Sequence, residues 1–154
     1  MKSISQWLSE YGESHTNKTN KIIHYICVPV IYMTVFGLLW SVPFPVEDAP
    51  IWLNWSTLLA MPVMVFYFML SIKVGLGMLL FSAAVVAFLS WWQVSMAMSV
   101  LTMSVIAFIL AWIMQFVGHH VEGKKPSFFK DVQFLLIGPA WILCHAYSKA
   151  NIRY

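Results

Sequence analysis

Two short polar stretches, far apart in this chain, contain four of its five histidines. Residues 11–30 read YGESHTNKTNKIIHYICVPV, and residues 115–126 read QFVGHHVEGKKP. Both stretches adjoin apolar segments, where an imidazole or carboxylate side chain costs free energy unless it has a partner. Imidazole and carboxylate groups are also common ligands of transition metals. We therefore interpret the two stretches as facing parts of one metal site.

The first stretch supplies two histidines and two asparagines. At 100° per residue, Asn17, Asn20 and His24 lie on one face of a helix. His15 is off that stripe and is expected just before the helix. Asparagine binds metals poorly beside histidine but can fix the tautomer of a ligating ring. We therefore expect His15 and His24 to be ligands, and the two asparagines to orient the rings or to bind a polar head group.

The second stretch offers further ligands. His119 and Glu122 lie three residues apart on one helical face, and His120 points to another. These three residues could supply one to three metal ligands, with Glu122 also suited to a supporting role. Lys124 could steer or bind an acidic substrate. Two or three histidines with a carboxylate and open positions are typical of non-haem iron enzymes that activate oxygen, but zinc accepts the same ligands, so spacing leaves the metal open.

The composition predicts where such a site would lie. The chain is 60% hydrophobic and 10% charged, whereas about a quarter of residues are charged in soluble domains. It is therefore expected to be an integral membrane protein with one domain, residues 1–154. Its nine Lys and Arg residues are dispersed, which argues against nucleic-acid binding. GxSxG, Walker and GxGxxG motifs are absent, so hydrolase, NTPase and dinucleotide-binding functions have no support.

The hydropathy pattern predicts an all-α membrane bundle. An amphipathic helix within residues 1–14 is expected to close at Gly12 and to lie on the membrane surface or on the protein itself. About four transmembrane helices follow, at residues 22–40, 51–70, 76–92 and 96–117, with a kink at Pro29 and a tight turn around Lys73. Residues 132–147 are apolar but short, and Gly138–Pro139 interrupts them, so a re-entrant or interfacial C-terminal helix pair is expected there.

The lysines predict the orientation in the membrane. They fall in the N-terminal tail, after the second span and after the fourth: Lys2, Lys18, Lys21, Lys73, Lys124, Lys125 and Lys130. Under the positive-inside rule these segments face the cytoplasm. An even number of spans then brings both histidine stretches to that face. We expect the inner membrane of a bacterium, or the endoplasmic reticulum if the protein is eukaryotic.

Two other functions fit the same residues. A non-catalytic membrane scaffold or lipid-binding protein would use its His and Asn side chains only to satisfy a kinked helix, and would bind no metal. A haem-binding bundle would use two axial histidines and absorb in the Soret band. His145 lies outside both stretches, and packing explains it better than metal ligation. The pattern leaves open whether the chain forms a homo-oligomer.

The motifs HxNxxNxxxH at residues 15–24 and GHxxEGxxP at residues 118–126, with Gly138–Pro139 later, resemble those of the membrane-bound 2-hydroxy fatty acid dioxygenase family. The resemblance covers essentially the whole chain. It implies an Fe(II)-dependent oxidoreductase of fatty acid α-oxidation, which uses O₂ to convert a 2-hydroxy fatty acid into the acid one carbon shorter. It also implies metal-binding or catalytic roles for His15, His24 and His119.

Overall fold

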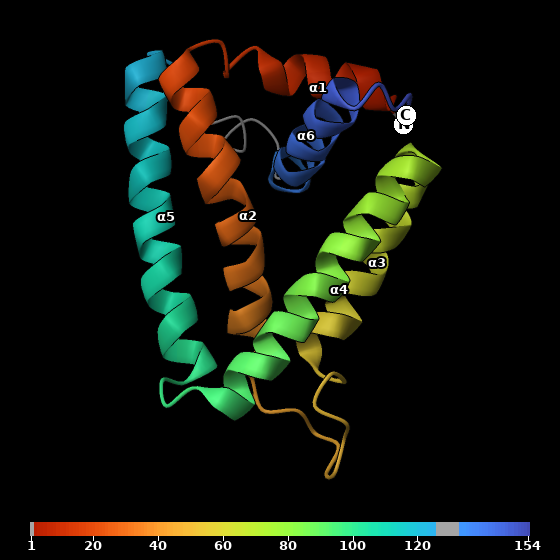
Figure 1. Ribbon diagram of the computed structural model, residues 1–154, viewed down its shortest axis with the longest axis vertical. Helices are drawn as coiled ribbons and strands as arrows, with labels where there is room; N and C mark the ends of the chain where they lie inside the picture. Colours follow the sequence, from red (N-terminus) through yellow and green to blue (C-terminus); the bar gives the residue numbers. More distant parts are fainter. Residues whose placement is uncertain (1, 126–132) are drawn as a thin grey trace.

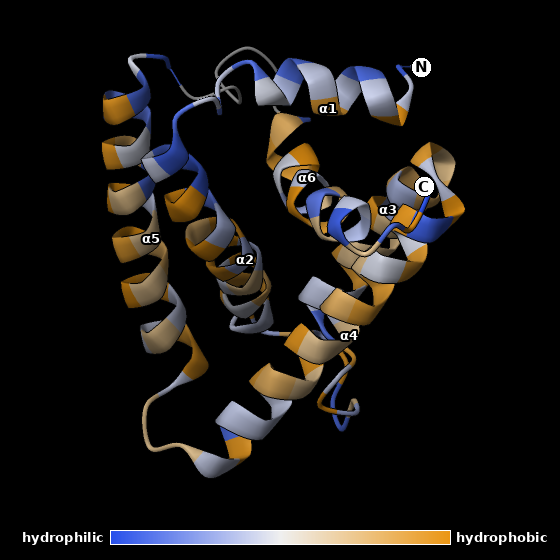
Figure 2. Ribbon diagram, turned by 45° about the horizontal axis from the view of Figure 1, so that its top comes forward, coloured by the Kyte–Doolittle hydropathy of each residue, from blue (hydrophilic) through white to orange (hydrophobic). Residues whose placement is uncertain are grey.

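The structure is a computed structural model that describes residues 2–125 and 133–154. Within these residues it is all-α, as predicted, with six helices: α1 (Ile4–Gly12), α2 (Lys18–Trp40), α3 (Trp55–Leu70), α4 (Ile72–Ser95), α5 (Val100–Glu122) and α6 (Phe134–Lys149). Three of the described helices, α2, α4 and α5, are long and apolar enough to cross a membrane, and α3 is a shorter apolar helix. Figure 2 shows hydrophobic residues along α3 and α5 and hydrophilic ones at the start of α2.

The second predicted span is shorter than expected. α3 begins at Trp55 rather than at residue 51 because Asn54 caps it, accepting hydrogen bonds from the backbone N–H groups of Ser56 and Thr57. Its 16 residues give a length of ~24 Å, short of the ~30 Å core of a bilayer. The four predicted spans are therefore three long helices and one shorter one.

The turn between α3 and α4 lies at Ser71 and not around Lys73 as predicted. Ser71 is extended, with φ −167° and ψ 136°, and its backbone N–H donates to the carbonyl oxygen of Tyr67 at 3.1 Å. Its hydroxyl accepts the N–H of Val74, so this one residue ends α3 and caps α4. Lys73 lies inside the first turn of α4, where its Nζ donates to the carbonyl oxygen of Arg153.

α2 and α5 lie side by side and run antiparallel (Figure 1). Two glycines permit this close approach. A Cβ on Gly37 would collide with the side chain of Ser104, and a Cβ on Gly118 would lie 2.5 Å from Oδ1 of Asn20. Small residues at both ends of the pair therefore bring the backbones together along its length.

Both helices of this pair extend further towards the histidine stretches than predicted. α2 begins at Lys18, one turn before the expected start, because the side chain of Asn17 accepts the N–H groups of Thr19 and Asn20. It continues through Pro29 to Trp40. α5 continues to Glu122 and ends at Gly123, which is left-handed with φ 72°. His24 and His119 are therefore held on the ends of helices, and His15 lies on the short connection just before α2.

The predicted break at Gly138–Pro139 is wrong. α6 is a single helix from Phe134 to Lys149 with Pro139 inside it; the start of the predicted stretch, residue 132, lies outside the described residues. A proline costs one helical hydrogen bond, and packing offsets this loss. A Cβ on Gly138 would lie only 3.0 Å from the hydroxyl oxygen of Tyr11 and 3.3 Å from Val28, and the hydroxyl of Tyr67 donates to the carbonyl oxygen of Leu136 at 2.7 Å.

α1 packs on the protein itself. Ser3 and Gln6 cap its start in a reciprocal capping box. Its two buried aromatic residues, Trp7 and Tyr11, cluster with Phe134 and Ile137 of α6, and the Trp7 and Phe134 rings meet edge to face at 5.3 Å. α1 and α6 thus lie together across the end where the α2–α5 and α3–α4 pairs diverge (Figure 1).

We predict that Gly118→Ala destabilises the protein by about 1–3 kcal/mol, because the added methyl group must push the Asn20 side chain away from α5. Thermal unfolding in detergent measures this effect. Gly12→Ala is the matched control, since a Cβ there has no neighbour closer than 3.9 Å. Equal melting temperatures for the two variants would contradict a tight α2–α5 contact.

Candidate metal centre

Three buried histidines from distant parts of the chain meet at one point. His15 comes from the connection before α2, His24 from the second turn of α2, and His119 from the last turns of α5. One ring nitrogen from each lies within 4.8 Å of the others. The ring centroids are 4.2 Å apart for His15 and His24, 4.9 Å for His24 and His119, and 5.3 Å for His15 and His119. The predicted meeting of the two stretches is confirmed.

Main-chain carbonyl groups orient two of the rings. Nδ1 of His15 lies 2.6 Å from the carbonyl oxygen of Tyr11, and Nδ1 of His24 lies 2.9 Å from that of Asn20. A carbonyl oxygen can only accept, so each Nδ1 carries the proton and each Nε2 keeps a free lone pair. This is the arrangement in which imidazole ligates a metal while its other nitrogen is held in place.

The surroundings keep the His15 ring neutral. It is stacked on the Tyr11 ring at 4.2 Å with an interplanar angle of 8°, and the Trp141 ring lies 5.5 Å away. Burial lowers the pKa of His15 from 6.5 to about 4, although the hydrogen bond to Tyr11 opposes this effect. His15 is therefore a neutral imidazole at neutral pH, as a metal ligand must be.

The donor set fits a divalent transition metal. Nε2 of His15 and Nδ1 of His119 are buried and have no hydrogen-bond partner, which is costly for a polar atom that stays empty. Among the described residues, no fourth His, Cys, Asp or Glu joins the three converging imidazoles. This arrangement leaves coordination positions for other molecules. His15, His24 and His119 could thus hold one ion with open positions.

The carboxylate of Glu122 is hydrogen-bonded to the start of α2 and not to a histidine ring. Its Oε1 accepts the backbone N–H of Thr16 at 2.8 Å and the Thr16 hydroxyl at 2.5 Å. Its Oε2 accepts the backbone N–H of Asn17 at 2.9 Å and the side-chain amide of Asn20 at 3.0 Å. Both oxygens are therefore engaged at the positive end of α2, where a negative charge is stabilised.

The asparagine side chains do not orient the histidine rings, which was one of the two roles expected of them. The side chain of Asn17 caps α2. The side chain of Asn20, fully buried, donates to the carbonyl oxygen of Ser14 at 3.1 Å and to Glu122. Neither amide touches a histidine ring within hydrogen-bonding distance; it is the main-chain carbonyl of Asn20 that holds His24.

The remaining predicted residues lie outside the cluster. His120 is exposed on α5 and is not among the three converging histidines. Lys124 is exposed and its Nζ donates to the carbonyl oxygen of Glu13, while Lys130 lies outside the described residues. His145 is exposed and stacks on Tyr25 at 5.3 Å and on Trp141 at 6.1 Å, which is packing.

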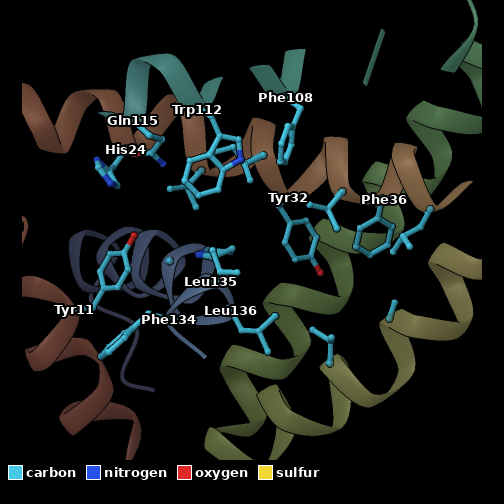
Figure 3. A pocket seen from close by; sticks show the side chains of 18 of the residues that line it. Tyr11, His24, Tyr32, Phe36, Phe108, Trp112, Gln115, Phe134, Leu135 and Leu136 are labelled. Carbon is cyan, nitrogen blue, oxygen red and sulfur yellow. The ribbon is translucent and has the colours of Figure 1, made fainter. Parts of the chain in front are cut away.

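A mainly apolar cavity of about 350 Å³ opens beside the histidines. Its walls come from five helices, and Figure 3 shows Tyr11, His24 and Gln115 near one end and Tyr32 and Phe36 near the other. No Lys, Arg, Asp or Glu of the described residues lines it. The sequence interpretation did not single out Tyr11 or Gln115 as site residues. Gln115 could have been found, because it lies one turn before His119 on the same face of α5.

Fold and site together define an all-α protein with three candidate membrane spans and a buried three-histidine cluster at the end of an apolar cavity. The chain belongs to the Mpo1-like family, since the model of that family, described as 2-hydroxy-palmitic acid dioxygenase Mpo1-like, matches residues 1–150. No curated protein and no solved structure matches the chain.

We predict that Glu122→Gln weakens metal binding by about 10–100-fold while leaving the fold intact, because a neutral amide holds the Thr16 and Asn17 N–H groups less strongly. Metal titration of the purified protein measures this. Glu10→Gln is the control, since Glu10 only pairs with Lys2 at the surface. Equal affinities in both variants would show that the carboxylate does not position the ligands.

We also predict that the metal-free protein loses stability in acid through His15. Unfolded His15 takes up a proton near pH 6.5 and buried His15 near pH 4, so between these values the unfolded state binds more protons. The free energy of unfolding should therefore fall as the pH drops from 6.5 to 4, by roughly 3 kcal/mol for this residue. Denaturant titrations of wild type and His15→Gln should show a shallower pH dependence in the variant; parallel curves would contradict it.

Proposed function

We propose that this protein is an Fe(II)-dependent dioxygenase that uses O₂ to cleave the C1–C2 bond of 2-hydroxy fatty acids. C2 becomes the carboxyl carbon of the acid one carbon shorter, C1 leaves as CO₂, and the four electrons pass to O₂ with release of one water. The observation that carries the proposal is the opening of the three-histidine cluster into an apolar cavity, in a chain of this family. A site of this kind brings a metal ion and a long hydrocarbon chain into one compartment.

His15, His24 and His119 would hold the iron. When bound, Fe(II) supplies the coordination positions for O₂ and for the hydroxyl and carboxylate groups of the substrate, and the electrons that activate oxygen. The carbonyl oxygens of Tyr11 and Asn20 keep the protons of His15 and His24 on Nδ1. Glu122 keeps the start of α2 against the end of α5, so the ligands stay together.

The cavity suits the rest of the substrate. Its lining is dominated by aliphatic and aromatic side chains such as Val28, Ile31 and Phe108, which favour a hydrocarbon tail and exclude water. A buried carboxylate needs a compensating charge, and no described cationic side chain lines the cavity. A metal ion at the histidines would provide that charge, and we therefore propose that the acid group lies at the metal end.

The positions of the lysines support a cytoplasmic site. The starts of α2 and α4 and the end of α5, which lie near Lys18, Lys73 and Lys124, all point towards the end of the protein that α1 and α6 cover (Figure 1). Under the positive-inside rule this end faces the cytoplasm. We propose the inner membrane of a bacterium, or the endoplasmic reticulum in a eukaryote, as its location.

The decisive experiment measures bound metal in protein purified in detergent. We predict near-stoichiometric iron in the wild type, and loss of most of it in His15→Ala, His24→Ala and His119→Ala, because each removes one of three converging ligands. His120→Ala is the matched control and should keep its iron, since His120 is exposed outside the cluster. The iron-loaded wild type should consume O₂ with 2-hydroxypalmitate.

Each alternative leaves its own signature in this experiment. A folded wild type without metal, even after anaerobic addition of Fe(II), would contradict the proposal and favour a scaffold or lipid-binding protein. A Soret band would indicate haem. Zinc in place of iron, with no O₂ uptake after exchange for Fe(II), would keep the site but overturn the reaction.

A further inference from the structure

Gln115 is a buried amide in an otherwise apolar wall. Its side chain is 5% exposed and lines the cavity. Its Oε1 is buried and has no hydrogen-bond partner. Most buried polar atoms in native proteins are hydrogen-bonded, because an empty acceptor costs free energy. An empty acceptor on a side chain that lines a cavity therefore points to a ligand that fills it.

The helix places this amide between the metal site and the apolar part of the cavity. Four cavity residues of α5 recur along one helical face: Phe108, Trp112, Gln115 and His119. Gln115 is one turn from His119, and Figure 3 shows it beside His24. A ligand held at the histidines would therefore lie next to Gln115.

Three of the other polar groups that line the cavity are already engaged. The hydroxyl of Tyr32 is hydrogen-bonded to that of Ser82 at 2.8 Å, and Ser56 donates to Oδ1 of Asn54 at 2.6 Å. At the metal end, Nδ1 of His24 is held by a main-chain carbonyl. Gln115 thus differs from these groups in offering an unused acceptor.

We infer, on the basis of the proposed function, that Gln115 binds the substrate and selects for its 2-hydroxyl group. A hydroxyl group has a proton to donate to Oε1, whereas an ionised carboxylate has none. The acid group therefore lies on the metal side, the C2 hydroxyl donates to Gln115, and the tail follows the apolar wall. An acid without the hydroxyl would leave Oε1 empty, and a site built to bond a hydroxyl discriminates strongly against such an analogue.

The test compares the binding of two acids in the absence of O₂, so that no turnover occurs. Radiolabelled 2-hydroxypalmitate and palmitate are bound to the Fe(II)-loaded protein, immobilised in detergent. Wild type should prefer the hydroxy acid. Gln115→Met, which keeps the shape but removes the acceptor, should lower this preference about tenfold with unchanged iron content.

Phe108→Leu is the matched control. Phe108 lies on the same face of α5 and has no polar atom, so its replacement should change the affinity for both acids in parallel and leave their ratio unchanged. Gln115→Asn is a second variant in case Gln115→Met does not fold; it moves the acceptor away by one methylene and should also lower the preference.

The outcomes separate this inference from the proposed function. A wild type that binds both acids equally, or neither, overturns both. A wild type that prefers the hydroxy acid, together with a Gln115→Met or Gln115→Asn variant that keeps the full ratio, overturns the role of Gln115 and leaves the dioxygenase proposal standing. A lost preference with retained iron supports the role.

Discussion

The histidine cluster depends on the hydrogen bonds that the carboxylate of Glu122 accepts. This carboxylate lies at the end of α5 and accepts hydrogen bonds from Thr16, Asn17 and Asn20 at the start of α2. His15 directly precedes Thr16 in sequence, and His119 lies one turn before Glu122. One ionic contact at the positive end of a helix therefore fixes the relative position of ligands that come from both stretches. The close approach at Gly118 brings Asn20 within reach of this carboxylate.

The backbone of the first stretch orients the rings that Glu122 brings together. His15 and His24 each bond the carbonyl oxygen of the residue four positions earlier. Such bonds need no particular side chain at the accepting position, so a search for polar side-chain partners overlooks them. The asparagine side chains have other roles: Asn17 caps α2, and Asn20 donates a hydrogen bond from α2 to Glu122.

The sequence was enough to predict which histidines come together, but not which groups support them. The spacing of His15, His24 and His119, combined with an even number of passes, was sufficient to predict that the two stretches meet. The supporting roles depended on single hydrogen bonds that spacing does not reveal. The same holds for the fold: the apolar segments were predictable, but a serine cap set the α3–α4 turn at Ser71, and packing against Tyr11 and Val28 kept α6 continuous through Pro139. Local propensity alone favoured a turn around Lys73 and a break at Gly138–Pro139.

The position of His15 outside the long helices has a thermodynamic consequence. His15 lies on the short connection between α1 and α2, and α1 is packed on α6 through Trp7 and Phe134. An ion held by His15, His24 and His119 would join this connection to two membrane-length helices. Ion binding would then also stabilise the state in which α1 and α6 are docked over the end of the cavity. Occupancy of the metal site and closure of the cavity at that end are in this way linked, so that a change that favours one also favours the other.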